Sequence, residues 1–230
     1  MGIFLYCNFY QSQIKSVNFG QDIPYILSLT PSITTTSDAG NGIGYTTLRV
    51  RGTDPSRINI TSNGVPQSDA ESSQLFWVNM ADFASNLQSM QIQRGVGTST
   101  NGTGAFGATI NMLTENIGTK PYVGLDLSAG SYYSHKQTVR FSSGLLNEHW
   151  GIQGRLSNIG SKGYLDRAFT KLNSYFLQAG YFSIFSRRGK WLQSAKIQRA
   201  AYEWQYIAGG KYYRGIVLAS AKIWHHTLDK

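Results

Sequence analysis

The chain has 230 residues and combines a hydrophobic content of 41% with a charged content of only 14%, with 25 glycines and 14 tyrosines. Few charges with many aromatic residues and glycines are typical of a β-rich or membrane-facing protein, and no apolar run is long enough for a transmembrane helix. The net charge of +9 is concentrated in residues 187–230, which hold nine Lys and Arg against two acidic residues.

Residues 1–16 match none of the patterns that follow, and we treat them as a separate N-terminal segment. They begin with MGIFLYC, an interrupted apolar run without a basic start or a small-residue cleavage site, so they do not read as a signal peptide. The single Cys7 forms no intramolecular disulfide, and we assign it no role.

Residues 17–118 are predicted to mix helix and strand in one domain. A short helix is expected to start at Asp22, with Asp22 as the N-cap and Pro24 in its first turn, and to end before Pro31. A second short helix is predicted over 80–89, where apolar residues recur at helical spacing.

Four strands are expected to build one small sheet within this domain. They are predicted at 46–51, 57–62, 89–94 and 107–113. Asn63-Gly64 is a turn signal after the second of them. The last two flank a glycine-rich polar loop, whose glycines indicate positive φ angles or close backbone approach. This loop lacks the Gly-Lys-Ser/Thr ending of a phosphate-binding loop.

Residues 119–182 change to long runs of alternating apolar and polar residues. Strands of about ten residues are predicted at 121–131, 136–145, 150–159 and 173–182, the length of a tilted membrane-spanning strand. We expect one apolar outer face, formed by Val123, Leu125, Leu127, Ile152, Leu156, Leu177 and Ala179. A soluble β-sandwich would alternate in a similar way, so this pattern alone leaves both classes open.

Four motifs follow one another in an order that resembles a known family. They are IPYILSLTPSI at 23–33, TLRVRGTD at 47–54, RINITSNGVP at 57–66 and RGVGTSTNGTGAFGATINM at 94–112. Together they resemble the plug domain of TonB-dependent outer-membrane receptors, and the GVGTSTNG form resembles receptors of the Bacteroidetes lineage. The resemblance is close over residues 17–115 and continues to about residue 182.

The resemblance implies an α+β plug domain followed by antiparallel β-strands of an incomplete outer-membrane β-barrel. In that family plug arginines pair with carboxylates of the barrel wall, which implies plug–barrel contacts for Arg51 and Arg94. The matched plug-motif positions are Gly52, Asp54, Gly64, Gly95 and Gly107.

The implied function is active uptake of a scarce or large ligand of the siderophore, cobalamin or glycan class, with the plug as gate. The implied partners are the TonB energy-coupling complex and the outer membrane. About four strands fit into residues 120–182, whereas a plugged transporter has about 22. We therefore expect a fragment that does not transport alone, and whose natural N-terminus with its export signal lies elsewhere.

Residues 183–230 lose the alternating pattern and form a basic tail. One explanation is a frameshift near residue 183 that makes the tail non-native. Alternative functions are a secreted soluble β-rich binding module, or a nucleic-acid-binding protein that acts through the tail, where aromatic residues lie among basic ones. We favour neither, and expect no nucleic acid partner, no enzyme activity and no cofactor; His225, His226 and Asp229 are too loosely spaced for a metal site.

Overall fold

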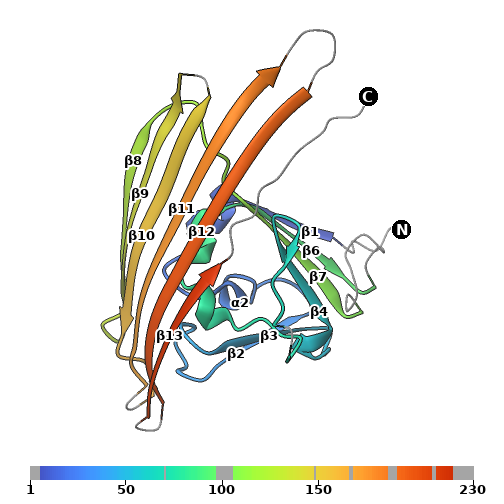
Figure 1. Ribbon diagram of the computed structural model, residues 1–230. Helices are drawn as coiled ribbons and strands as arrows, with labels where there is room; N and C mark the ends of the chain where they lie inside the picture. Colours follow the sequence, from blue (N-terminus) through green and yellow to red (C-terminus); the bar gives the residue numbers. More distant parts are fainter. Residues whose placement is uncertain are drawn as a thin grey trace.

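The computed structural model describes residues 6–69, 71–96, 106–147, 149–165, 168–185, 191–208 and 211–219, and from residue 181 onward it describes the backbone alone. The chain forms two packed parts (Figure 1). Residues 6–117 form an α+β unit, which we call the N-terminal body. Residues 122–219 form a tall antiparallel sheet, which we call the wall sheet, and the N-terminal body lies against one of its faces.

A five-stranded mixed sheet organises the N-terminal body, in the order β1-β6-β7-β4-β5. Its strands are β1 (Tyr6–Tyr10), β6 (Leu87–Arg94), β7 (Ala108–Thr114), β4 (Ile58–Ser62) and β5 (Val65–Pro66). The β4–β7 pair is parallel and the other pairs are antiparallel. Apolar residues of the three central strands form the core with less than 5% exposure: Ile58, Ile60, Met90, Ile92, Ile110 and Met112. Each such side chain contributes roughly 1.5–3 kcal/mol by leaving water.

One expectation for this sheet was wrong. The strand at 46–51 is not part of it, because β3 (Thr46–Val50) pairs with β2 (Ile33–Ser37) in a separate two-stranded sheet that turns Leu48 and Val50 into the core. The described residues of the N-terminal segment 1–16 also contact this sheet. Their β1 pairs with β6, and Ile14 of the following helix α1 (Gln11–Val17) is buried, since this edge of the sheet would otherwise expose apolar surface.

The helices are short, and one prediction failed. The first helix is confirmed as α2 (Ile23–Ile26), with Asp22 at the N-cap and a proline in the first turn. The predicted helix over 80–89 is instead two 3₁₀ helices, η2 (Trp77–Met80) and η3 (Phe83–Asn86). Asp82 between them has a φ of +52°, the left-handed conformation that interrupts a right-handed helix. A further 3₁₀ helix, η1 (Pro55–Arg57), follows Asp54.

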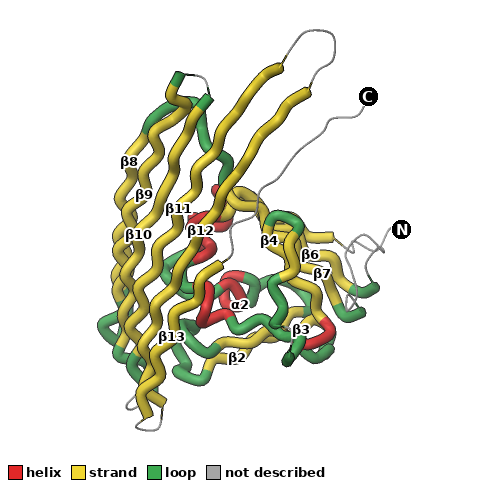
Figure 2. Tube along the Cα trace, in the orientation of Figure 1, coloured by secondary structure: helices red, strands yellow, loops and turns green. Residues whose placement is uncertain are grey.

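The wall sheet has six strands that pair strictly in chain order (Figure 2). They are β8 (Tyr122–Ala129), β9 (His135–Leu146), β10 (Trp150–Ser161), β11 (Thr170–Phe185), β12 (Trp191–Ala208) and β13 (Lys211–Ala219). The four predicted strands are confirmed. The backbone also continues into β12 and β13, so the change in sequence pattern at residue 183 does not end the sheet; the proposed frameshift stays a prediction.

The two faces of the wall sheet differ as the alternation predicts. Residues expected on the apolar outer face point away from the N-terminal body, and Val123, Leu125 and Leu127 are 80%, 63% and 67% exposed. Lys136, Thr138 and Arg155 of the opposite face are buried against the body. The outward residues therefore do not close over a private core. Among the described residues, no helix has the length and apolarity needed to cross a membrane.

Asp22 does not cap its helix with its side chain. Its carboxylate accepts a hydrogen bond from the Thr46 hydroxyl at 2.9 Å instead, which joins α2 to β3. Complete burial raises the pKa of Asp22 to about 7, although hydrogen bonds from Thr46 and Gly44 act in the opposite direction. The fold therefore favours the protonated acid, and this stability is complete below the ordinary pKa near 4 and is lost as the pH rises through 7.

We expect Asp22→Asn to remove this loss, because an amide keeps the acceptor oxygen without the charge. Between pH 4.5 and pH 8 the wild-type chain should lose on the order of 2–4 kcal/mol more than the variant, the free energy of a shift of this size. The measurement is the urea-unfolding midpoint at both pH values. Asp38→Asn, at an exposed position, serves as the control; equal pH profiles for wild type and Asp22→Asn would contradict the prediction.

Candidate functional site

A buried ion cluster joins the N-terminal body to the wall sheet. The carboxylate of Asp82 forms ion pairs with two cations of the wall sheet. Its oxygens lie 2.8 Å from Lys136 Nζ of β9 and 2.9 Å from Arg155 Nη1 of β10. The three side chains are 0%, 3% and 1% exposed in that order. Charges removed from water to this degree cost several kcal/mol each unless they are paired and hydrogen-bonded, so this contact fixes how the two parts sit together.

Hydroxyl groups complete the shell around Asp82. Thr138 and Ser157 of the wall sheet donate to Oδ2 at 2.9 and 2.7 Å, and Ser85 of η3 donates to Oδ1 at 2.6 Å. Arg155 also donates to the backbone carbonyl of Asp82 and to Ser174 Oγ of β11. Asp82 thereby contacts two adjacent strands of the wall sheet directly and a third strand through Arg155.

The electrostatics keep Asp82 ionised. Burial alone would raise its pKa, but the neighbouring charges of Arg155 and Lys136 outweigh burial, and the pKa lies well below its usual range. The stability that this carboxylate contributes is therefore present above its ordinary pKa near 4 and is lost in stronger acid. The left-handed backbone of Asp82 is held against its intrinsic preference by the same contacts.

A second contact lies at the end of the wall sheet where residues 130–134 join β8 to β9. Asn41, from the loop between β2 and β3, donates to Ser161 Oγ at 2.8 Å, and Tyr164 N donates to the Ala39 carbonyl at 3.3 Å. This loop is anchored inside the N-terminal body, since Asp22 N donates to the Gly42 carbonyl at 2.8 Å. The N-terminal body is thus attached to the wall sheet both in the middle and at this end.

The glycines of the predicted motif have structural roles. Gly52 and Gly64 have φ angles of +74° and +75°; Gly64 follows Asn63 in the two-residue turn of the β4–β5 hairpin. Gly95 has a φ of +91°. A Cβ at Gly107 would overlap the Thr53 side chain, so only glycine fits there.

Polar contacts hold the remaining motif residues near these glycines. Asp54 caps η1 by accepting a hydrogen bond from Ser56 N at 3.0 Å. Arg94 Nη1 donates to the Pro31 carbonyl at 3.2 Å. Arg51 has a φ of +52°, and a Cβ on Gly95 would lie 3.5 Å from its Nη1. Contacts of Arg51 and Arg94 with wall carboxylates stay a prediction.

Sequence reasoning missed the site that joins the two parts in the structure, which is separate from the contacts predicted for Arg51 and Arg94. The N-terminal body supplies the carboxylate and the wall sheet supplies the cations. The signal was present, because the alternation of β9 and β10 places Lys136 and Arg155 on the inward face without an acidic residue beside them. Asp82, an acid within the apolar stretch 76–84, is the matching partner.

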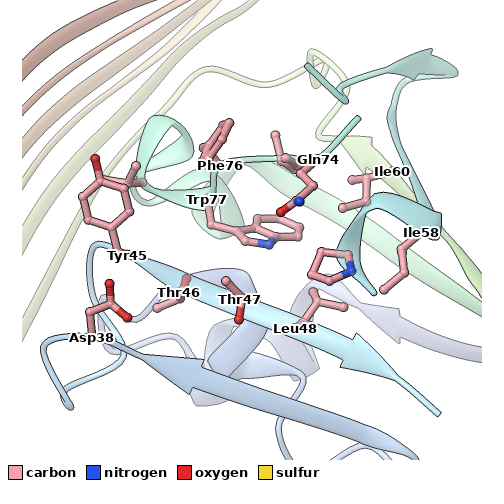
Figure 3. Close-up of a pocket in the computed structure, with 13 residues that line it drawn as sticks. Asp38, Tyr45, Thr46, Thr47, Leu48, Ile58, Ile60, Gln74, Phe76 and Trp77 are labelled. Carbon is pink, nitrogen blue, oxygen red and sulfur yellow. The ribbon is translucent and has the colours of Figure 1, made fainter. Parts of the chain in front are cut away.

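A small cavity lies inside the N-terminal body (Figure 3), and a more open hollow of about 510 Å³ lies against Ser89 and Gln91 of β6 and Asn111 of β7. The small cavity is bounded by Thr46, Thr47 and Leu48 of β3 and by the ring of Trp77, and its volume is about 120 Å³. A cavity of this size holds a few water molecules, whereas sites for small-molecule ligands measure roughly 300–1,000 Å³. Among the described residues, no group of three or more His, Cys, Asp or Glu side chains is placed to hold a metal ion.

Comparison with known proteins gives one family match and many structural matches. The model of the TonB-dependent receptor plug domain matches residues 9–109. No curated protein matches the chain.

Three solved structures illustrate the structural likeness. The siderophore receptor PirA from Acinetobacter baumannii is 14% identical with a TM-score of 0.64, over 90% of this chain and 32% of that protein. The copper transporter OprC is 17% identical with a TM-score of 0.67, over 89% and 32%. The ferric yersiniabactin uptake receptor FyuA from Yersinia pestis is 12% identical with a TM-score of 0.60, over 89% and 38%. The chain therefore spans about a third of these proteins' length.

The ion cluster makes a quantitative prediction. Asp82→Asn leaves Lys136 and Arg155 buried without a counter-charge, and we expect it to lower the free energy of unfolding by about 3–5 kcal/mol. Tryptophan fluorescence during urea unfolding at pH 7.5 measures the change.

Asp126→Asn is the matched control, because it removes the partner of Arg140 in a pair whose carboxylate is 46% exposed. It should cost less than about 1 kcal/mol. Adding Lys136→Met to Asp82→Asn should restore part of the loss, since one uncompensated charge is removed. If Asp82→Asn were no less stable than Asp126→Asn, the cluster would not carry the contact between the two parts.

Proposed function

Because the chain carries a TonB-dependent receptor plug domain at residues 9–109, we propose that it is the gate and the first wall strands of an outer-membrane receptor for active uptake. In this proposal the N-terminal body is the plug and the wall sheet is the beginning of the barrel that encloses it. The TonB energy-coupling complex supplies the work that moves the plug, and the ligand then passes. We expect no enzyme activity from an assembly of this kind.

The main observation behind the proposal is that the N-terminal body packs against one face of a wall sheet whose two faces differ. The inward face holds the Asp82 cluster among polar residues and packs Ile159, Leu172 and Phe176 into the core of the N-terminal body. The outward face exposes Val123, Leu125 and Leu156. Contact between an apolar face and lipid costs no free energy, whereas exposure of the same face to water is unfavourable. A secreted soluble module would need to bury the same residues.

The pairing of the wall strands supports a larger assembly. In the described part of the chain, β8 and β13 each have one neighbour only, so the six-stranded sheet ends in two open edges. An open edge is not tolerated in the hydrocarbon of a bilayer, because its backbone groups would lack hydrogen-bond partners. We propose that further strands close the wall and that the chain alone does not transport. The siderophore, cobalamin and glycan classes remain the candidate ligands.

A conductance measurement tests the gate without knowledge of the ligand. The chain is first extended by the coding sequence that flanks it, and the complete receptor is inserted into planar lipid bilayers. We expect little conductance from the intact receptor, and stable open channels after deletion of residues 6–117, because the plug then no longer fills the lumen.

The 230-residue chain alone is the control and should form no stable channel, since its sheet has open edges. A complete receptor that conducts equally with and without residues 6–117 would refute the gate. Stable channels formed by the 230-residue chain would refute the proposal that further strands are needed.

A further inference from the structure

Two wall connections and one loop of the N-terminal body meet at one end of the wall sheet. They are residues 130–134, residues 161–165 and residues 38–44. Ser134 Oγ lies 2.8 Å from Ser161 Oγ, and Asn41 Nδ2 donates to the same Ser161 oxygen. The three segments therefore form one joined surface, which we call the outer platform.

The turn that projects from the outer platform is strained. Tyr132 and Tyr133 both have left-handed backbones, with φ angles of +57° and +55°, in the turn closed by Ser134 N donating to the Ser131 carbonyl at 3.1 Å. Such turns strongly prefer asparagine and glycine, and a bulky residue at each position costs free energy. Lys162 N donates to the Tyr132 carbonyl at 2.9 Å and holds the turn in place. Backbone strain that is held in place by such hydrogen bonds points to a function for the side chains of Tyr132 and Tyr133.

The rings on the outer platform are open to solvent and are held by neighbouring side chains. Tyr132 and Tyr164 meet edge to face, with ring centres 5.5 Å apart and planes at 88°. Lys162 Nζ lies 3.9 Å from the centre of the Tyr133 ring. Tyr132, Tyr133 and Tyr164 are 49%, 75% and 63% exposed. The Tyr164 ring also packs beside Gly40, so it lies over the N-terminal body and not on the outward face of the wall.

These tyrosines do not belong to a belt at the lipid boundary. The strand register places Leu125, Val139, Leu156 and Tyr175 in one outward row across β8–β11. The next row towards the platform is Leu127, Gln137, Asn158 and Asn173, and the last is Ala129, His135, Gly160 and Lys171. The apolar band thus gives way to mainly polar rows. From Val139 to His135 the strand advances roughly 13 Å, and the platform lies beyond.

The charge of the outer platform limits what it can bind. Residues 38–44, 130–134 and 161–165 contain one basic residue, Lys162, and one acidic residue, Asp38. The ammonium of Lys162 is already placed over a ring. An anionic ligand would find little attraction here, whereas tyrosine faces and hydroxyls suit a neutral ligand that has both C–H faces and hydroxyl groups. Sugar rings have this chemistry.

We propose that the outer platform is a saccharide-binding surface, with Tyr132, Tyr133 and Tyr164 as the side chains that stack on uncharged sugar rings. The proposal rests on the proposed function, and it further takes this end of the wall as the end that faces the outside of the cell and meets the ligand first. It selects the glycan class among the ligands considered above.

Binding of oligosaccharides to the 230-residue chain in detergent micelles tests the proposal. The probes are maltohexaose, xylohexaose and chitohexaose, with hexagalacturonate as the anionic comparison, and calorimetric titration gives each Kd. We expect at least one uncharged probe to bind more tightly than hexagalacturonate. Tyr132→Ala and Tyr164→Ala should each weaken that binding roughly tenfold, as expected when one stacked ring is lost.

Two further variants separate loss of a ring from loss of fold. Tyr132→Gly relieves the left-handed strain and should stabilise the turn, yet it should weaken binding as much as Tyr132→Ala does. Tyr175→Ala removes an exposed tyrosine of the outward face and should leave Kd within about twofold, a difference of roughly 0.4 kcal/mol.

The proposal is overturned if no uncharged probe binds, if hexagalacturonate binds most tightly, or if Tyr175→Ala weakens binding as much as Tyr164→Ala. Each of these results leaves the conductance of the plug-deleted receptor unaffected, so failure of the saccharide surface is distinguishable from failure of the gate.

Discussion

The arrangement of this molecule depends on one carboxylate that is shared between two cations away from water. Asp82 could not remain ionised at 0% exposure without Lys136 and Arg155, and these two could not be buried without Asp82. Mutual dependence of this kind fixes position more strictly than apolar packing does, because an apolar contact tolerates sliding and a desolvated ion pair does not. For the proposed gate, the consequence is a closed state of defined geometry whose opening requires work or a new partner for each charge.

The cluster also explains why local sequence preference fails between residues 77 and 86. Apolar residues in this stretch recur at helical spacing, and a continuous helix would satisfy them. In the structure the backbone of Asp82 is left-handed, and both its carboxylate and its carbonyl contact Arg155. A continuous right-handed helix would exclude this backbone conformation. The tertiary ion pairs outweigh the cost of two broken turns, so the segment forms two 3₁₀ helices.

The wall sheet shows how a strict alternation gives one sheet two faces of different chemistry. Phe141 packs its ring over Gly154 on the outward face, while Arg155, the next residue, reaches the Asp82 cluster on the inward face. Because neighbouring residues of a strand point to opposite faces, a shift of one residue in register would turn the cations to the outward face and the apolar row towards the N-terminal body. The pairing of these strands is therefore specified by both faces together.

The sequence by itself determined the elements whose stabilising partners are close along the chain or repeat with a fixed period. The wall strands β8–β11, their apolar outward face, the Asn63-Gly64 turn and the order of the plug motifs all belong to this class. Only the tertiary structure decided the pairing of β1 with β6, the separation of β3 from the main sheet, and the partners of Asp82, which lie more than fifty residues away. An alternating pattern predicts that Lys136 and Arg155 face inward, but it does not predict which residue they contact. Ion pairs between residues so far apart in the sequence depend on how two surfaces pack together, and only the tertiary structure shows that packing.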